Sequence, residues 1–383
     1  MAARLETREG IGGHPLLVGA GIVIVLTGLL LLALNAADQG FGGTALGLAL
    51  STLPAPILVA LVLALDRLEP EPPRLLALTF LWGATVAVLF ATIVNTAGGE
   101  VVGGMFGQRA GEVFLVSISA PFVEEVLKAA ALLLVFRLAR HELNGLVDGV
   151  VYAGMVGLGF AVGENVHYYA DALASGDTAL VLVVRGVFTP FAHPLFTAMF
   201  GLGLAYAAET RGTGRRVRVA LLGLLAAIVV HAAWNSAFFL TRPVLLAIYF
   251  LVFWPLLIGV LLVLRKGVHR EGRIIRTELA PLVVHGTLDA DDVEALGTLR
   301  GRRAALARAE AAAGAHGKRA ARELAEVATE LAFRRHLAGG AVSPADAADI
   351  TRLAALQARA SGRPSPSVPT TELDQGAAPC PIH

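Results

Sequence analysis

The chain has 383 residues, of which 56% are hydrophobic and 16% are charged, and its mean hydropathy is +0.68. One soluble core cannot bury that much apolar surface, so the composition predicts an all-α, polytopic membrane helix bundle. A formal net charge of +1 gives no signal for nucleic acid, and we expect no nucleic-acid partner. The sole cysteine, Cys380, excludes an intramolecular disulfide and a cysteine-based metal site.

Windows of about 20 apolar residues predict about eight transmembrane helices. They lie approximately at 15–35, 45–65, 75–97, 112–136, 146–170, 179–206, 217–240 and 243–264. The first apolar segment is too long for the apolar region of a typical signal peptide, so we expect it to be retained as the first helix. The transmembrane bundle is thus predicted to occupy residues 1–265.

Lysine and arginine side chains predict the orientation of these helices. Fifteen fall on one side of the membrane: Arg4, Arg8, Arg67, Arg74, Arg137, Arg140, Arg211, Arg215, Arg216, Arg218, Arg265, Lys266, Arg270, Arg273 and Arg276. The opposite loops hold only Arg109 and Arg242. Because basic residues favour the cytoplasmic side, we expect a multi-pass protein of the cell membrane with both termini in the cytoplasm.

A proline-rich loop precedes the third predicted helix, and stripes of small residues mark the fifth. The loop Asp66–Arg74 alternates charges with prolines, which enforce an extended turn; a stiff solvated connector is the simpler interpretation. The fifth helix carries small residues at four-residue spacing, which allow helix backbones to approach closely, so we expect it at the centre of the bundle. These residues are Gly149, Ala153 and Gly157 on one stripe and Gly159 and Gly163 on another.

The fourth helix contains two carboxylates and an ammonium within apolar sequence, at Glu124, Glu125 and Lys128. A charge at membrane depth costs about 2.5–3.5 kcal/mol on insertion scales, which favours a functional site over chance. Glu124 and Lys128 lie one turn apart on the same face. Pro121 removes a backbone donor and is expected to kink the helix just before the acids. The alternative is an ion pair that only holds helices together.

The next three helices carry further polar residues. They are Glu164 and Asn165 in the fifth helix, Arg185 and His193 in the sixth, and His231 and Asn235 in the seventh. An interfacial aromatic belt explains the neighbouring tyrosines but not Glu164. His193 lies between two prolines, and His231 and Asn235 are one helical turn apart, so both can point to one place.

Acids and histidines that face a water-filled cavity provide what amide hydrolysis requires, namely a base, oxyanion donors and an acid for the leaving amine. We predict that Glu124 activates water and that Glu125 and Lys128 set its protonation state. The candidates for oxyanion stabilisation are His231 and Asn235. The candidates for orientation or leaving-group protonation are Glu164, beside Asn165, and His193.

A zinc site uses the same residues. His193, His231 and one of Glu124 or Glu164 could supply the three protein ligands of a catalytic zinc ion. Lys128 beside the acids would repel a divalent cation, and asparagine is an unusual zinc ligand, so the sequence favours a metal-free mechanism and keeps zinc as the alternative. No cofactor is required by the sequence itself.

Other functions remain open from the residues alone. Intramembrane acids, histidines and proline-broken helices also mark proton- or ion-coupled transporters, although no internal repeat pairs the two halves of the chain. A catalytically inactive membrane receptor or scaffold is a further alternative. The absence of a serine near a histidine, of paired mid-helix aspartates and of a His-Glu-x-x-His helix disfavours three other kinds of intramembrane protease.

Over roughly residues 55–240 the chain resembles PrsW-type intramembrane proteases, which are related to the CAAX prenyl endopeptidases and bacteriocin-processing membrane proteases. The matching motifs are Asp66–Pro72, Glu124-Glu125-x-x-Lys128, Gly159-Phe160 with Glu164-Asn165, the Arg185–His193 segment, and His231 with Trp234-Asn235. In the wider group the residue equivalent to Glu164 is commonly histidine. The resemblance implies an intramembrane endopeptidase that cleaves a single-pass membrane protein within the lipid bilayer, typically an anti-sigma factor, in regulated proteolysis.

After Leu264 the sequence becomes charged and alanine-rich and keeps a helical periodicity. Asp289 and Ser343-Pro344 are typical of helix N-termini, so we expect several short amphipathic helices in a small cytoplasmic module over residues 266–360. Its basic patches are suited to the anionic cytoplasmic leaflet. Residues 361–383 are rich in proline and of low complexity, which predicts a disordered tail.

Overall fold

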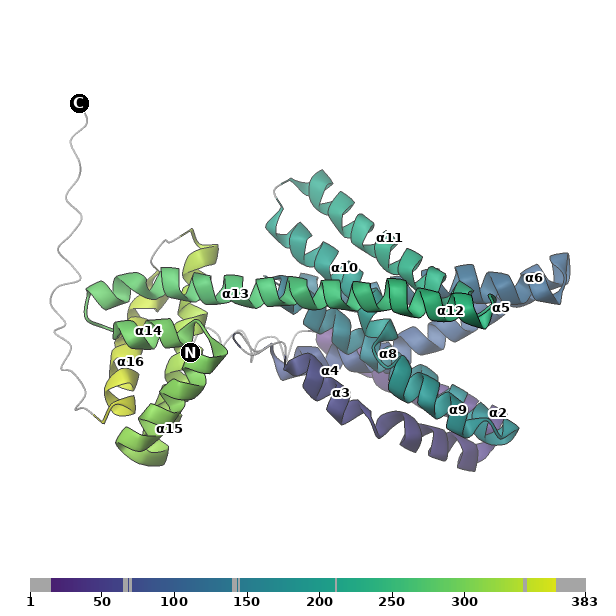
Figure 1. The fold of residues 1–383 in the computed structure, drawn as a ribbon, viewed down its shortest axis with the longest axis horizontal. Helices are drawn as coiled ribbons and strands as arrows, with labels where there is room; N and C mark the ends of the chain where they lie inside the picture. Colours follow the sequence, from purple (N-terminus) through teal and green to yellow (C-terminus); the bar gives the residue numbers. More distant parts are fainter. Residues whose placement is uncertain are drawn as a thin grey trace. The chain divides into compact units, whose positions relative to one another are not determined.

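The structure is a computed structural model that describes residues 15–64, 68, 71–139, 143, 145–210, 212–339 and 343–362. Within these residues every regular element is a helix, as the all-α prediction requires. The chain divides into two compact units, one up to Val268 and the other from His269 onward, and each has an apolar core of its own. Figure 1 shows the helices of both units.

The first unit contains short π-helical turns, labelled η, within longer helices. Its elements are α2 (Pro15–Thr52), α3 (Ala55–Leu63), α4 (Pro73–Trp82), η1 (Gly83–Ala87), α5 (Val88–Phe106), α6 (Gln108–Phe114), η2 (Leu115–Ser119), α7 (Ala120–Leu138), α8 (Leu146–Ser175), α9 (Thr178–Val183), η3 (Val184–Phe188), α10 (Ala192–Glu209), α11 (Thr213–Ala237), α12 (Arg242–Ile248), η4 (Tyr249–Phe253) and the start of α13 (Trp254–Val284). Such π-helical turns are frequent at functional sites.

Six helical segments of the described chain are long and apolar enough to cross a membrane. They are Pro15–Leu63, Pro73–Phe106, Leu146–Ser175, Thr178–Ala208, Thr213–Ala237 and Arg242–Val284. The multi-pass character is therefore supported, whereas the predicted number of eight stays a prediction.

Two segments account for the difference between six and eight. The helical stretch from α6 to α7 carries three charged side chains near its middle, so its composition separates it from the uniformly apolar helices. Pro15–Leu63 is a single segment where two helices were predicted. Inside it, α2 has a kink at Gly40, whose φ of 73° lies in the left-handed region that glycine adopts without a Cβ clash.

The turn between α5 and α6 is shorter than predicted. Between the predicted helices 75–97 and 112–136, the structure has helix on both sides of Gly107, whose φ is 92°. The sixth predicted helix is interrupted at Thr189–Phe191, between η3 and α10. Just before the acids, the structure has the π-helical turn η2, which ends two residues before Pro121.

Helix α8 forms the centre of the first unit, as its stripes of small residues predict. Its two glycine stripes face two different neighbours. A Cβ atom on Gly157 would lie 2.6 Å from the backbone nitrogen of Pro194 in α10, and one on Gly159 would overlap the backbone of Phe80 in α4. Only glycine permits these backbone approaches, so the two stripes fix α10 and α4 against α8.

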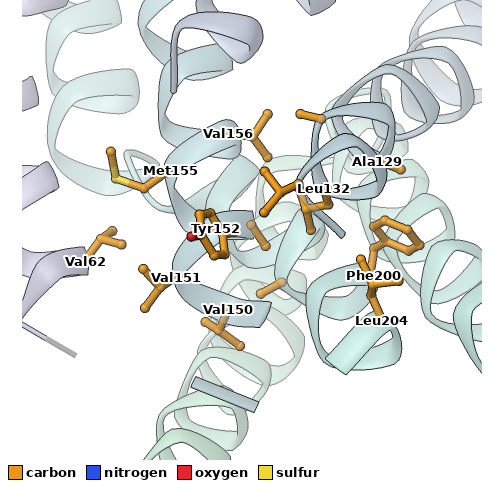
Figure 2. Close-up of a cluster of buried hydrophobic side chains, with 14 of the residues drawn as sticks. Val62, Ala129, Leu132, Val150, Val151, Tyr152, Met155, Val156, Phe200 and Leu204 are labelled. Atoms are coloured by element: carbon orange, nitrogen blue, oxygen red, sulfur yellow. The ribbon is translucent and has the colours of Figure 1, made fainter. Parts of the chain in front are cut away.

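Apolar side chains complete this packing. Figure 2 shows Tyr152 and Val156 of α8 close to Leu132 of α7, with Phe200 of α10 in the same cluster. Tyr152 is fully buried, and its hydroxyl donates a hydrogen bond to the carboxylate of Glu71 at 2.6 Å. Glu71 is itself buried, so this end of the proline-rich loop is not the solvated connector considered above. Asp66, Arg67, Glu69 and Pro70 of that loop lie outside the described residues.

We expect Gly157→Ala and Gly149→Ala each to lower the stability of the protein by about 1–3 kcal/mol, because overpacking a tight interface forces backbones apart. At Gly149 the added Cβ would overlap the carbonyl oxygen of Gly201. The measurement is the thermal unfolding midpoint in detergent. Gly19→Ala is the matched control, since nothing lies within 4 Å of its added Cβ. Equal midpoints for all three variants would contradict the packing role of the stripe.

The second unit contains the end of α13, then α14 (Ala290–Leu296), α15 (Leu299–Leu337) and α16 (Pro344–Ala360). Its core gathers Ile275, Leu279, Leu324, Ala328, Leu331, Leu353 and Leu356 with eight further apolar side chains. The capping prediction at Ser343 is confirmed: its hydroxyl accepts from the backbone nitrogen of Asp346, whose carboxylate accepts from the Ser343 nitrogen. Asp289 occupies the N-cap position of α14, although its side chain makes no capping hydrogen bond.

The prediction of several short helices in this region is wrong in one place. Helix α13 runs unbroken from Trp254 to Val284 through the predicted boundary at residue 265. Over its 39 residues α15 consists of two helices joined at a kink at Ala313 and Gly314. Alanine, arginine and glutamate are strong helix formers, so a change in composition does not end a helix. The cytoplasmic location of this unit stays a prediction, and the predicted tail lies, from residue 363 onward, outside the described residues.

Candidate active site

The structure brings all eight predicted site residues into one cluster within the first unit. They come from four helices: Glu124, Glu125 and Lys128 from α7, Glu164 and Asn165 from α8, His193 from α10, and His231 and Asn235 from α11. Six of the eight line a cavity of about 660 Å³, whereas Glu125 and Lys128 do not line it. The close packing of α10 on α8 therefore places the polar residues of separate helices beside one another.

Lys128 is completely buried and connects three of these helices. Its Nζ atom lies 2.8 Å from Oε1 of Glu125, 2.9 Å from Nδ1 of His193 and 3.9 Å from the ring centroid of Phe160. An ammonium group can only donate hydrogen bonds, so Nδ1 of His193 accepts. The proton of His193 is thereby assigned to Nε2, which donates to Oε2 of Glu164 at 3.2 Å.

Glu125 orients the second histidine. Its Oε1 atom accepts from Nδ1 of His231 at 2.9 Å as well as from Lys128. Because Nδ1 of His231 carries this proton, Nε2 keeps its lone pair. That Nε2 atom faces Oε2 of Glu124 at 3.8 Å.

Glu124 is the least satisfied group in the cluster. Its Oε2 atom is buried and has no hydrogen-bond partner among the described residues. It lies 3.5 Å from Nζ of Lys128 and 4.0 Å from Nδ1 of His193. The three carboxylates of the cluster face two cations, since Lys128 pairs with Glu125 and Arg185 with Glu164. Lys128 is shared between Glu124 and Glu125 and makes its hydrogen bond to Glu125, so Oε2 of Glu124 keeps an ion-pair contact at 3.5 Å but no hydrogen bond, which is costly at a buried position.

A divalent cation fits this donor set. Glu124, His193 and His231 each offer one ligand atom, and these atoms all lie within 4.8 Å of one another. Two histidine nitrogens and one carboxylate oxygen match the three protein ligands of a catalytic zinc site, and a carboxylate behind a ligating histidine is its usual partner. Lys128 would have to turn away from His193 for Nδ1 to bind a cation. Glu164, the other predicted ligand, is instead engaged by Arg185 and His193.

The two asparagines have partners that the sequence did not indicate. Nδ2 of Asn235 donates to the backbone carbonyl of Val116 in η2 at 3.1 Å, so its role as an oxyanion donor stays a prediction. Oδ1 of Asn165 accepts from Arg185 at 2.5 Å. The guanidinium of Arg185 also stacks on the ring of Tyr168, 3.4 Å from its centroid. Arg185 thus anchors η3 to α8 at the edge of the site.

Thr197 was not among the predicted site residues. This residue is fully buried in α10, and its hydroxyl donates to Oε2 of Glu125 at 2.9 Å. A threonine inside an apolar helix usually bonds to its own backbone and gives no signal of function. The four-residue spacing from His193, which places both side chains on one face, is the pattern that could have indicated it.

The fold and this cluster define a class: a polytopic membrane protein with a buried carboxylate–histidine site beside a cavity. Residues 71–260, which include every predicted site residue, match the family model described as PrsW family intramembrane metalloprotease. The chain is thus similar, over its membrane-spanning part, to PrsW-family intramembrane proteases. The wider relation to CAAX prenyl endopeptidases and bacteriocin-processing enzymes stays a prediction.

Two relatives carry the name Protease PrsW. The protein of Geobacillus kaustophilus (strain HTA426) is 32% identical over 139 residues, which cover 36% of this chain and 55% of that protein. The protein of Clostridioides difficile (strain 630) is 25% identical over 207 residues, which cover 52% of this chain and 84% of that protein. The chain therefore spans about half the length of the first relative. No solved structure matches the chain.

Proposed function

We propose that this chain is an intramembrane endopeptidase of the PrsW type, which hydrolyses a peptide bond in a membrane-anchored protein. The observation that carries the proposal is the carboxylate of Glu124. Its Oε2 atom is buried beside a cavity, lacks a hydrogen-bond partner in the described chain, and lies 3.8 Å and 4.0 Å from ring nitrogens of His231 and His193. The family match supports the same activity and does not favour a transporter or an inactive scaffold.

In this proposal Glu124 transfers the proton during hydrolysis, and the neighbouring charged side chains support it. A water molecule in the cavity loses a proton to Glu124 while its oxygen attacks the substrate carbonyl, and Glu124 then delivers that proton to the leaving amine. Glu125 keeps Nε2 of His231 directed at the same place. Lys128 and Arg185 balance the charges of Glu125 and Glu164, so the surrounding carboxylates can remain buried.

The proposal includes a divalent cation, since the matched family is described as a metalloprotease and the donor set fits. Glu124, His193 and His231 would hold it. When bound, such an ion lowers the pKa of a water ligand and polarises a carbonyl group. Glu124 has two carboxylate oxygens, so one would be available to hold the ion and the other to accept a proton. This revises the metal-free preference from the sequence, which rested on the charge of Lys128 and on Asn235 as an unusual zinc ligand beside His231.

The finer proposal concerns the substrate. A catalytic cluster inside a lipid-embedded bundle is suited to a single-pass membrane protein, and an anti-sigma factor in regulated proteolysis is the substrate that the family resemblance implies. The test is to reconstitute the purified chain in lipid vesicles with candidate single-pass proteins and to identify the products by mass spectrometry. Wild type is expected to cleave, and Glu124→Ala is not.

Glu112→Ala is the matched control, because Glu112 is an exposed carboxylate on the preceding helix α6 and is expected to be dispensable. Cleavage by Glu124→Ala at the wild-type rate would refute the proposed site. Solute uptake by the vesicles without cleavage of any candidate would favour the transporter alternative.

We also propose that both termini face the cytoplasm. The expected result is that an impermeant thiol reagent labels Gln108→Cys but not Gly214→Cys in intact cells, when Cys380 is replaced by serine. Both positions are exposed and lie in the first turns of α6 and α11, at helix ends that the distribution of basic residues assigns to opposite sides of the membrane. Labelling after cell lysis shows that Gly214→Cys is reactive. The opposite pattern would invert the orientation.

A further inference from the structure

Both oxygens of Glu125 are occupied. Oε1 accepts from Lys128 at 2.8 Å and from His231 at 2.9 Å, and Oε2 accepts from the hydroxyl of Thr197 at 2.9 Å. The side chain of Glu125 is 0% exposed, and so is Thr197. Bulk water therefore has no access to replace the hydrogen bond from Thr197 if that hydroxyl is removed.

The hydroxyl of Thr197 behaves unlike that of Thr79, another fully buried helical threonine of the same unit. Thr79 donates to the carbonyl of Leu76 at 2.9 Å, one turn earlier in its own helix, which is the usual arrangement. Thr197 instead donates across from α10 to a carboxylate on α7. Its position is set by the packing of α10 on α8, where Gly157 touches the backbone of His193 one turn before Thr197.

The orientation of Glu125 determines which nitrogen of His231 is free. With Oε2 held by Thr197, Oε1 stays in line with Nδ1 of His231 and retains its proton there. The lone pair of Nε2 then faces Glu124. If the carboxylate rotated, His231 would lose the partner that selects this tautomer, as happens when the outer partner of a catalytic histidine is removed.

We propose that Thr197 is a positioning residue of the active site, whose hydroxyl holds Glu125 in the orientation that fixes the tautomer of His231. This inference rests on the proposed proteolytic function. It gives the adjacent glutamates different roles, because Glu124 reacts with water whereas Glu125 only aligns a histidine. Thr197 touches neither the substrate nor the reacting atoms.

The test compares Thr197→Ala with Thr197→Ser, which differ by one oxygen atom. Loss of an outer partner of this kind typically lowers activity about 10–100-fold, so kcat of Thr197→Ala is expected to fall by that factor and kcat of Thr197→Ser by less than about threefold. KM is expected to remain unchanged in both, since the substrate contacts are untouched. Thr79→Val is the matched control, because it removes a buried hydroxyl that bonds to its own helix, and it is expected to keep wild-type kcat.

A purely structural role would lower the unfolding midpoint of both Thr197 variants without separating their kcat values. Thr197→Val, which keeps the volume of threonine, repeats the comparison with serine if the alanine variant does not fold. Equal kcat for the serine variant and the variant without a hydroxyl would overturn the inference. If that equality occurs while Glu124→Ala is inactive, the positioning role fails alone; if Glu124→Ala is active, the proposed function fails.

Discussion

Glu124→Gln is expected to abolish proteolysis while leaving the folded protein as stable as wild type. Removal of a general base typically costs about 10²–10⁴-fold in rate. The Glu124→Gln variant should be as stable as wild type because Oε2 of Glu124 has no hydrogen bond to lose. Lys128 also keeps its closer partner, Glu125. The measurements are cleavage of a reconstituted substrate and the thermal unfolding midpoint in detergent.

Glu125→Gln provides the contrast. Its carboxylate accepts from three buried donors, and two of these, Lys128 and His231, belong to the same cluster as Glu124. Removing one partner of a buried ion pair typically destabilises a protein by about 3–5 kcal/mol, so this variant should lose both stability and activity. Equal midpoints for the two glutamine variants would contradict the distinct roles of the two acids. A stable and active Glu124→Gln protein would remove Glu124 from the mechanism.

The candidate site could be predicted from the sequence as a set of residues but not as a network. Glu124, Glu125 and Lys128 are conspicuous because charges are costly inside apolar helices, and helical spacing already places Glu124 and Lys128 on one face. The two glutamates are neighbours in the same motif, so the local sequence does not indicate which of them has hydrogen-bond donors at both carboxylate oxygens. That distinction depends on Thr197, which lies 72 residues away and comes into contact only through the packing of α10.

For the fold as well, local features could be predicted from the sequence, but the contacts between helices could not. The small residues of α8 predict a tightly packed helix, and the structure confirms it, because close backbone approach is a local property of glycine. The partners of the two stripes, α10 and α4, could not be derived from that pattern, since any helix with a matching surface would satisfy it. The continuous helix α13 was divided in the prediction because charged residues indicate a change of surroundings rather than a helix end.

Zinc content is expected to separate the three proposed ligands, Glu124, His193 and His231, from the other polar residues around them. Wild type purified without chelator should contain about one zinc per chain, and His193→Ala and His231→Ala should each lose the metal together with the activity, because three protein ligands are the usual set for a catalytic zinc ion. His167→Ala is the matched control. Its side chain is 54% exposed and lies at 4.0 Å from Asp38, and it is not one of the three converging ligands.

Glu164→Gln tests the predicted alternative ligand. Because Glu164 accepts from Arg185 and from Nε2 of His193, its removal should disturb the orientation of His193 but leave zinc bound. Chelation of the wild type should abolish cleavage, and added zinc should restore it. Full activity in protein shown by elemental analysis to be free of zinc would instead support the metal-free mechanism, in which Lys128 stays on His193 and Glu124 acts on water alone.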